Sequence, residues 1–190
     1  MRISKVGISG LDFSVWSSGL PMATDAETLV ESKDRAKRLA SASRGSGHDN
    51  FLKGIVVHFY VEASNKFWVE MQRYHFVEII SSQSTMHKMA SFDLCYDKHV
   101  DPRIVAIMQE LQDKYNLTKD KEDYMNLIYS NPAGFILGAG LVTNYQQLKT
   151  IYHQRRTHRL QEWQTFCDWV ESLPNSEWIT GKKEEELTCT

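Results

Sequence analysis

The sequence predicts an α+β fold, with a small antiparallel or mixed sheet and long helices. Residues 55–62 are β-branched and aromatic, which is typical of a strand. Several longer stretches carry apolar residues at helical spacing behind a capping residue. Strand-like and helix-like segments do not alternate regularly, so a doubly wound parallel sheet is not expected.

The individual elements follow from apolar spacing, capping residues and turn signals. In chain order we expect a strand over 3–13, a loop over 14–25, a helix over about 26–42, strands over 55–62 and 76–81 joined by a helix over about 66–74, a helix from Pro102, and helices over 119–130, 144–154 and 157–173. The expected N-caps are Thr24 or Asp25, Ser64 or Asn65, Asp101, and Thr143 or Asn144. The two strands joined by the 66–74 helix are expected to pair with each other. Residues 1–180 are read as one domain and residues 181–190 as a polar tail.

Composition and charge exclude several classes of protein. Hydrophobic residues make up 42% and charged residues 24% of the chain, which is ordinary for a folded domain and unlike an intrinsically disordered one. With 22 Lys and Arg against 24 Asp and Glu the net charge is −2, so we expect neither a nucleic-acid nor a membrane partner. No apolar run approaches the roughly 18 residues of a membrane span, and the first residues lack a secretory apolar core. The three cysteines form no C-x-x-C, so we expect a cytoplasmic protein without a zinc or other metal site.

Four short segments carry the candidate chemistry, and the common phosphate-loop, dinucleotide, zinc-protease and nucleophile-elbow motifs are absent. The four segments are Gly45-Ser46-Gly47-His48, Gln72-Arg73-Tyr74-His75, Ser81-Ser82-Gln83-Ser84-Thr85 and Gln154-Arg155-Arg156-Thr157-His158-Arg159. Each has a structural interpretation when taken alone. A loop His is usually solvated, hydroxyl-rich segments are usually turns, and cations are favourable at a helix C-terminus.

Taken together and in order, these segments resemble the flavin-dependent thymidylate synthases. The family signature R-H-R-x-x-S-x-N-E-x-S-x-R-Y aligns its His with His75 and its second Ser with Ser84 without a gap. His48 and the Gly before it stand where the family has a G-H segment. Arg155 follows Asn144 by eleven residues, as in the C-terminal half of the family.

The resemblance covers roughly residues 30–170, and the signature is altered within it. Tyr74 and Phe76 replace the two arginines that flank the His, and Ser82 replaces the Glu. The other replacements are Ile79, Ser81, Met86, His87 and, on the later helix, Gln146. A shift of one residue would place Arg73 on the first signature Arg at the expense of the match at Ser84.

The resemblance implies a flavin-dependent enzyme that makes dTMP from dUMP or acts on a related pyrimidine nucleotide. It implies FAD as cofactor, NADPH and methylenetetrahydrofolate as co-substrates, and a homotetramer whose sites are shared between subunits. Chemically, Arg suits a nucleotide phosphate because it makes bidentate hydrogen bonds. The predicted catalytic residues are Arg155 and Ser84, the predicted cofactor-binding residues are His48, His75, Asn144 and Arg73, and the predicted substrate-binding residues are Gln72, Gln83, Ser84, Arg155 and Arg156.

Two other interpretations stay open. A divergent homologue could keep the fold and bind another pyrimidine nucleotide, or bind a nucleotide or partner without catalysis. A helical protein that docks nucleic acid through the basic 154–159 segment is disfavoured, because the net charge is −2 and the strands lack interleaved basic and aromatic residues. The aromatic residues Phe67 and Trp68 are expected in the core, although Trp68 or Tyr74 could also pack beside a ligand.

Overall fold

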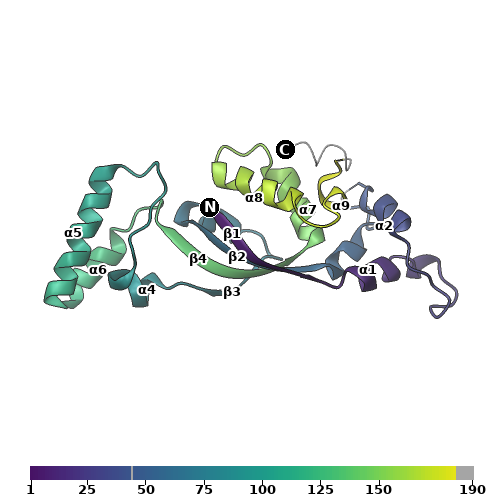
Figure 1. Ribbon diagram of the computed structural model, residues 1–190, viewed down its shortest axis with the longest axis horizontal. Coiled ribbons are helices and arrows are strands. Elements are labelled where there is room, and N and C mark those ends of the chain that lie inside the picture. Colours follow the sequence, from purple (N-terminus) through teal and green to yellow (C-terminus); the bar gives the residue numbers. More distant parts are fainter. Residues whose placement is uncertain (44, 183–190) are drawn as a thin grey trace.

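A curved four-stranded antiparallel sheet runs along the molecule, with helices over one face and at both ends (Figure 1). The computed structural model describes residues 1–43 and 45–182. The strand order is β1-β2-β4-β3. The strands are β1 (Arg2–Ser9), β2 (Val56–Ser64), β3 (Glu78–Ser82) and β4 (Ile136–Asn144). The expected α+β class with a small sheet is confirmed.

The helices surround this sheet unevenly. They are α1 (Leu11–Ser17), α2 (Lys33–Ala40), α3 (Asn65–Met71), α4 (Thr85–Lys88), α5 (Pro102–Thr118), α6 (Lys121–Tyr129), α7 (Tyr145–Arg155), α8 (Gln161–Glu171) and α9 (Glu177–Thr180), with 3-10 turns η1 (Leu20–Met22), η2 (Asn50–Gly54) and η3 (Met89–Ser91). Helices α7 and α8 lie over one face of the sheet, while α1 and α2 lie at one end and α5 and α6 at the other (Figure 1). No described helix is both long and apolar enough to span a bilayer.

Three expected helix starts are confirmed, because their capping side chains accept hydrogen bonds from the first turn. Ser64 Oγ accepts from Phe67 N at the start of α3, and Asn144 Oδ1 accepts from Gln147 N at the start of α7. Asp101 caps α5 in the same way.

The expected helix over 26–42 was wrong in its first half. Asp25 makes a local turn instead, in which its carboxylate accepts from Glu27 N at 3.0 Å. The helix begins at Lys33, after Ser32 accepts from Arg35 N. The expected strand over 3–13 likewise ends at Ser9, because the chain turns into α1 at Gly10.

The expected pairing of strands 55–62 and 76–81 was also wrong. β2 pairs with β1 and β4, and β3 pairs only with β4, so β4 lies between the two strands joined by α3. β4 matches β2 along its full length, and its Gly138 lets the Tyr60 ring of β2 lie close against it. β3 remains at the edge, and all five of its residues are exposed.

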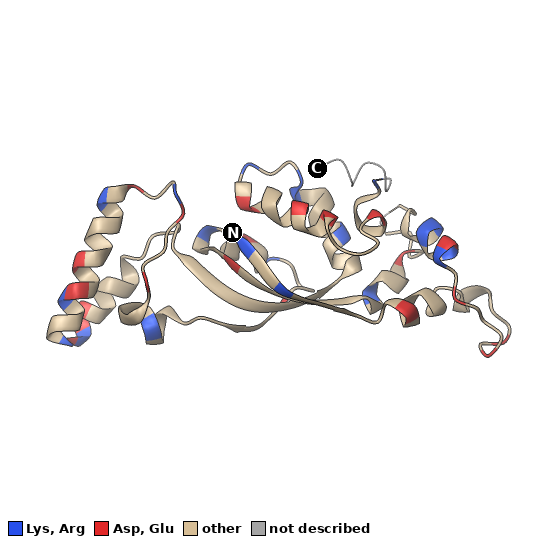
Figure 2. Ribbon diagram, in the orientation of Figure 1, with Lys and Arg blue, Asp and Glu red and all other residues tan. Residues whose placement is uncertain are grey.

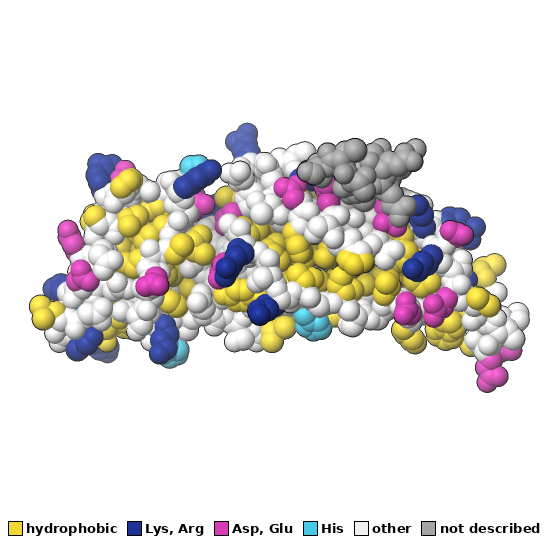
Figure 3. Space-filling view, in the orientation of Figure 1, with side chains coloured by type: hydrophobic (Ala, Val, Ile, Leu, Met, Phe, Trp, Pro, Cys, Tyr) yellow, Lys and Arg dark blue, Asp and Glu magenta, His cyan; other side chains and the backbone are white. Residues whose placement is uncertain are grey.

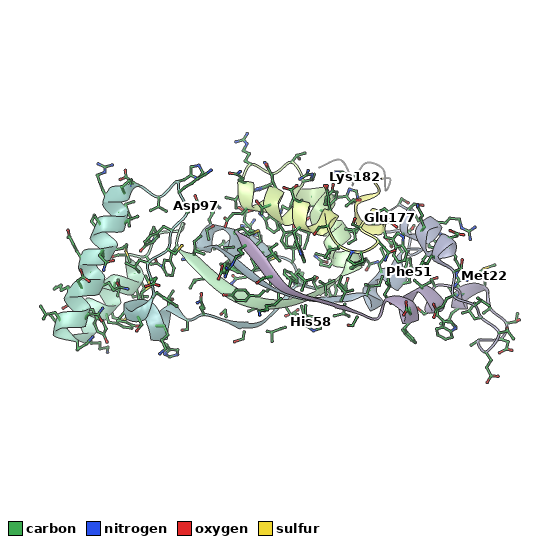
Figure 4. The ribbon with its side chains drawn as sticks, in the orientation of Figure 1. Met22, Phe51, His58, Asp97, Glu177 and Lys182 are labelled. Carbon is green, nitrogen blue, oxygen red and sulfur yellow. The ribbon has the colours of Figure 1, made fainter. Side chains whose placement is uncertain are left out.

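The core lies on one side of the sheet only. The alternate residues Val57, Phe59, Val61 and Ala63 of β2 are buried under the helices, whereas His58 points away from α7 and α8 (Figure 4). A second small core under α5 and α6 is formed by Met89, Met108, Leu127 and Phe135, and both cores contact Leu137. The polar tail was expected to begin at 181. α9 precedes it, and residues 183–190 lie outside the described part.

Gly10 and Gly181 both have a left-handed backbone, with φ of 78° and 72°, but only Gly10 is enclosed. A Cβ on Gly10 would collide with the Gly54 carbonyl oxygen, whereas a Cβ on Gly181 would meet open space. We predict that Gly181→Ala lowers the free energy of unfolding by roughly 1–2 kcal/mol. Gly10→Ala should lower it by clearly more. Urea denaturation of the two variants measures the difference, and equal losses would contradict the close approach of Gly10 to Gly54.

Candidate functional site

The structure places the sequence-predicted site residues in three separate locations within one chain. We call them the His48 pocket, the α3–β3 pocket and the Arg155 cluster. In the part of the chain that is described, no group of three or more His, Cys, Asp or Glu side chains is placed to hold a metal ion.

The His48 pocket is a cavity of about 680 Å³ between α1, η1, α2 and η2. Two of its lining residues, Met22 and Phe51, are labelled in Figure 4 and lie at the end of the molecule that carries α1 and α2. The full lining is Ser17, Ser18, Pro21, Met22, Arg35, Arg38, Leu39, Gly47, His48, Asn50 and Phe51. The pocket therefore combines apolar walls with hydroxyl, amide, imidazole and guanidinium groups.

The two arginines of the His48 pocket differ in their availability. The Arg35 guanidinium is held inside the fold, because it donates to Ser18 Oγ at 3.1 Å and to the carbonyl oxygens of Val15 and Val30 at 3.1 Å each. Arg38 has no ion-pair partner among the residues the structure describes. His48 itself is exposed, as the surface interpretation of its loop expected.

The α3–β3 pocket is smaller, about 140 Å³. One face of α3 supplies Asn65, Trp68 and Gln72, at helical spacing, and the end of β3 supplies Gln83. Gln83 extends the sheet with its side chain, because Gly138 N donates to Gln83 Oε1 at 2.7 Å while Gln83 N donates to the Gly138 carbonyl at 2.9 Å.

Few polar groups around the α3–β3 pocket are available to bind a ligand. Pairing with Gly138 occupies the Gln83 oxygen and leaves its amide NH₂ group for a ligand. Ser84 follows directly as the N-cap of α4, and its hydroxyl makes no capping hydrogen bond. Trp68 is buried and donates from Nε1 to the Leu137 carbonyl at 3.2 Å, so its expected place in the core is confirmed.

The Arg155 cluster lies on the opposite side of α3. The guanidinium of Arg155 pairs with Glu70 at 2.9 Å, donates to the Tyr74 hydroxyl at 2.7 Å and lies 4.6 Å from the Trp163 ring centroid. Tyr74 in turn donates to Gln154 at 3.0 Å. Tyr74, which stands at a signature arginine position, is thus one of the groups that hold Arg155.

Glu70 is the centre of this cluster. Trp163 Nε1 donates to its carboxylate at 2.9 Å, Lys66 lies at 3.3 Å and His158 at 3.5 Å. Burial alone would raise the pKa of Glu70. The hydrogen bonds from Trp163 and Lys66 and the charges of His158 and Arg155 outweigh burial and lower that pKa below its ordinary value.

The remaining predicted residues are dispersed. Arg156 pairs with Asp168 at 2.7 Å and Glu171 at 3.3 Å. Asn144 uses its side-chain oxygen to cap α7. Arg73 and His75 are exposed in the turn between α3 and β3.

One chain does not bring the predicted substrate-binding residues together. Gln72 and Gln83 share the α3–β3 pocket, whereas Arg155 meets Glu70 on the other side of α3. Residues 70 and 72 are two positions apart, so their side chains leave the helix about 200° apart. Sequence reasoning missed Glu70 and Trp163. The only local signal was the Lys66–Glu70 spacing of four residues, which is typical of a helix ion pair.

Comparison with known proteins identifies the fold. No family model matches the sequence, and no curated protein matches it. Two solved structures match nearly the whole chain, and both are of the flavin-dependent thymidylate synthase ThyX from Helicobacter pylori with FAD and dUMP. One has a TM-score of 0.75 at 13% identity, covering 95% of this chain and 97% of that one. The other has a TM-score of 0.76 at 14% identity, covering 99% of both. The resemblance is confirmed at the level of the fold.

Because the folded pKa of Glu70 is lowered, its ionisation stabilises the fold fully above its ordinary pKa of about 4.5, and the contribution is lost as the pH falls below that value. We predict that Glu70→Gln lowers the free energy of unfolding at pH 7 by roughly 1.5–3 kcal/mol, the scale of a charged hydrogen bond. The variant should also lose part of the acid-side slope. Urea denaturation from pH 7 to pH 3 measures both effects.

The exposed Glu110→Gln is the matched control for this experiment, and should change stability by no more than about 0.5 kcal/mol. A Glu70→Gln variant as stable as that control would show that the cluster contributes nothing to the fold.

Proposed function

We propose that the protein is a flavin-dependent enzyme that transfers a one-carbon unit to a pyrimidine deoxynucleotide, such as dUMP to dTMP. The proposal includes FAD as cofactor, NADPH and methylenetetrahydrofolate as co-substrates, and a cytoplasmic location. The observation that carries it is the near-complete fold match to structures that hold FAD and dUMP, in a chain whose His48 lines a large pocket.

The His48 pocket fits a flavin cofactor by size and by chemistry. Its volume of about 680 Å³ lies within the range of roughly 300–1,000 Å³ that small-molecule sites occupy. Leu39 and Phe51 supply apolar wall for a ring system, and Arg38, His48 and Asn50 supply groups for polar and phosphate atoms. When bound, the reduced flavin supplies hydride. The residues of this chain bind it and orient it.

The α3–β3 pocket carries the proposed pyrimidine contacts. Gln72 and the amide NH₂ group of Gln83 offer donors and acceptors there, which a pyrimidine edge requires. Ser84 does not line this pocket and follows Gln83 as the N-cap of α4. The pocket of about 140 Å³ is below the usual range for a whole ligand. We therefore propose that a neighbouring subunit of a homotetramer completes it.

The composition of the surface supports the proposal that subunits assemble through the exposed side of the sheet. Charged residues lie mainly on the helices and loops and are sparse along β2 and β4 (Figure 2). Hydrophobic side chains form a band across the middle of the face seen in the space-filling view (Figure 3). Near the α3–β3 pocket, Phe76 is 68% exposed and Ile80 is 61% exposed. A contiguous exposed apolar surface is typical of a protein–protein interface.

The phosphate contact is proposed for Arg155, and its surroundings favour a second candidate function beside the first. Arg155 is already paired with Glu70, Arg156 with Asp168, and Tyr74 and Phe76 stand at the signature arginine positions. A divergent homologue that takes another pyrimidine nucleotide, or binds one without catalysis, is the alternative that these pairings favour. Arg73, which has no ion-pair partner among the described residues, is then the next candidate for the phosphate.

Flavin binding and nucleotide choice can be tested together. We expect the purified protein to bind FAD, with absorbance in the blue, and to melt at a higher temperature with FAD and a pyrimidine monophosphate, because ligands of the folded state stabilise it. The missing signature carboxylate at Ser82 predicts that dUMP gives a smaller shift than another pyrimidine monophosphate. If dUMP gives the largest shift and supports dTMP formation with NADPH and methylenetetrahydrofolate, the altered-substrate alternative is wrong. If no flavin and no nucleotide binds, the enzyme proposal is wrong.

Arg155→Ala should weaken nucleotide affinity by about 10- to 100-fold, the equivalent of roughly 1.5–3 kcal/mol for a charged hydrogen bond. Titration calorimetry with the best-binding nucleotide measures this affinity. Arg103→Ala, an exposed arginine on α5, is the control and should leave the affinity unchanged. A folded Arg155→Ala variant with full affinity would assign Arg155 to the fold alone, and Arg73→Ala would then be measured in the same way.

A further inference from the structure

We infer that Lys149 is a positioning residue for His48, because its buried ammonium holds the loop that carries His48 into its pocket. The inference rests on the proposed function, in which the His48 pocket binds the flavin. Lys149 lies outside the segments that resemble the signature, and it lines neither the His48 pocket nor the α3–β3 pocket.

The Lys149 side chain is enclosed and fully partnered. It is 7% exposed and pairs at 2.8 Å with Asp49, whose side chain is 3% exposed. Its ammonium also donates to the carbonyl oxygens of Ala40 at 2.7 Å and Ala42 at 3.3 Å. An ammonium has three N–H donors, so these three acceptors satisfy it.

The acceptors place this lysine at the junction of three segments. Ala40 is the last residue of α2 and Ala42 lies two residues beyond it, so the cation meets the negative end of that helix. Asp49 is next to His48, and Lys149 belongs to α7. One buried charge therefore joins the end of α2, the His48 loop and α7.

A second α7 side chain fixes the other oxygen of the same carboxylate. Gln146 Nε2 donates to Asp49 Oδ1 at 3.3 Å and to Asn50 Oδ1 at 3.2 Å, whereas Lys149 binds Asp49 Oδ2. Both oxygens of Asp49 are thus held from α7. Gln146 stands where the resembled family usually has Arg, and in this chain it anchors the His48 loop.

The loop depends on this anchor because its own backbone is permissive. Gly45 and Gly47 have φ of 83° and 79°, conformations that glycine adopts at little cost. His48 Nδ1 and Nε2 have no hydrogen bond among the described residues. The Asp49 carboxylate, on the residue next to His48, is held by side chains of α7.

A buried ion pair is costly to desolvate, and replacing both partners by neutral groups is often tolerated. Removing only one partner leaves the other charge buried and unpaired, which is strongly destabilising. Because of this asymmetry, the positioning role of Lys149 can be tested separately from its contribution to the stability of the fold. Lys149→Met removes the ammonium that holds the loop and leaves the Asp49 carboxylate buried without its cation. Adding Asp49→Asn removes that buried charge but does not restore the ammonium.

The experiment measures FAD affinity by fluorescence titration, and hydrogen exchange of the backbone amides of residues 45–50 without ligand. Lys149→Met should weaken FAD binding at least tenfold and speed exchange in that loop at least tenfold. The Lys149→Met/Asp49→Asn variant should recover the melting temperature but neither the affinity nor the slow exchange. Lys114→Met breaks a more exposed Lys–Asp ion pair, to Asp123 on the distant α5 and α6, and is the control that should change neither readout.

Repeating the substitution in a His48→Ala background tests whether Lys149 acts through His48. There Lys149→Met should change FAD affinity by less than twofold. An equal loss of affinity with and without His48, or full recovery of affinity in the double Lys149 and Asp49 variant, would overturn the inference. Unchanged exchange at residues 45–50 would overturn it as well. If the unaltered protein binds no FAD, the proposed function fails, and the exchange measurement still decides whether Lys149 holds the loop.

Discussion

The packing of aromatic side chains between α3, α8 and the covered face of the sheet is the interaction on which the rest of the structure depends. The Phe67 ring of α3 lies 4.5 Å from the Trp163 ring of α8, and Trp163 lies 5.7 Å from Phe166. Phe166 in turn meets Phe59 of β2 at 6.2 Å. Ring pairs at these separations contribute beyond the area they bury. Because they set α3 against α8, they also decide which face of α3 meets Arg155 and which face is left for the α3–β3 pocket.

Helix α7 links the loop of the His48 pocket to the Arg155 cluster through buried charges. Lys149, in the middle of α7, pairs with Asp49 beside His48, and Arg155, at its end, pairs with Glu70 of α3. Each pair places opposite charges where water is largely excluded, so each strengthens its own geometry while removing one partner is expensive. A rotation of α7 would therefore disturb both locations. Residues that are distant in the sequence are thus linked through one helix.

Local signals in the sequence predicted local structure well. The starts of α3, α5 and α7 were predictable because Ser64, Asp101 and Asn144 cap them through short-range hydrogen bonds. Strand order was not predictable, because the position of β4 between β2 and β3 depends on side-chain fit such as Tyr60 against Gly138. The Arg155–Glu70 and Lys149–Asp49 pairs join residues 85 and 100 positions apart and have no local signature. His48, predicted from the resemblance, and Gln72 and Gln83, predicted as polar groups for a pyrimidine, each line a pocket. The sequence could not show that Tyr74 and Glu70 already hold Arg155.

A crystal structure of the protein soaked with FAD and dUMP tests the central claim most directly. We expect FAD in contact with His48, and the pyrimidine against Gln72 and Gln83 at a boundary between two subunits. A flavin bound away from His48, a pyrimidine enclosed within a single chain, or a protein that takes up neither ligand at saturating concentration would contradict the account.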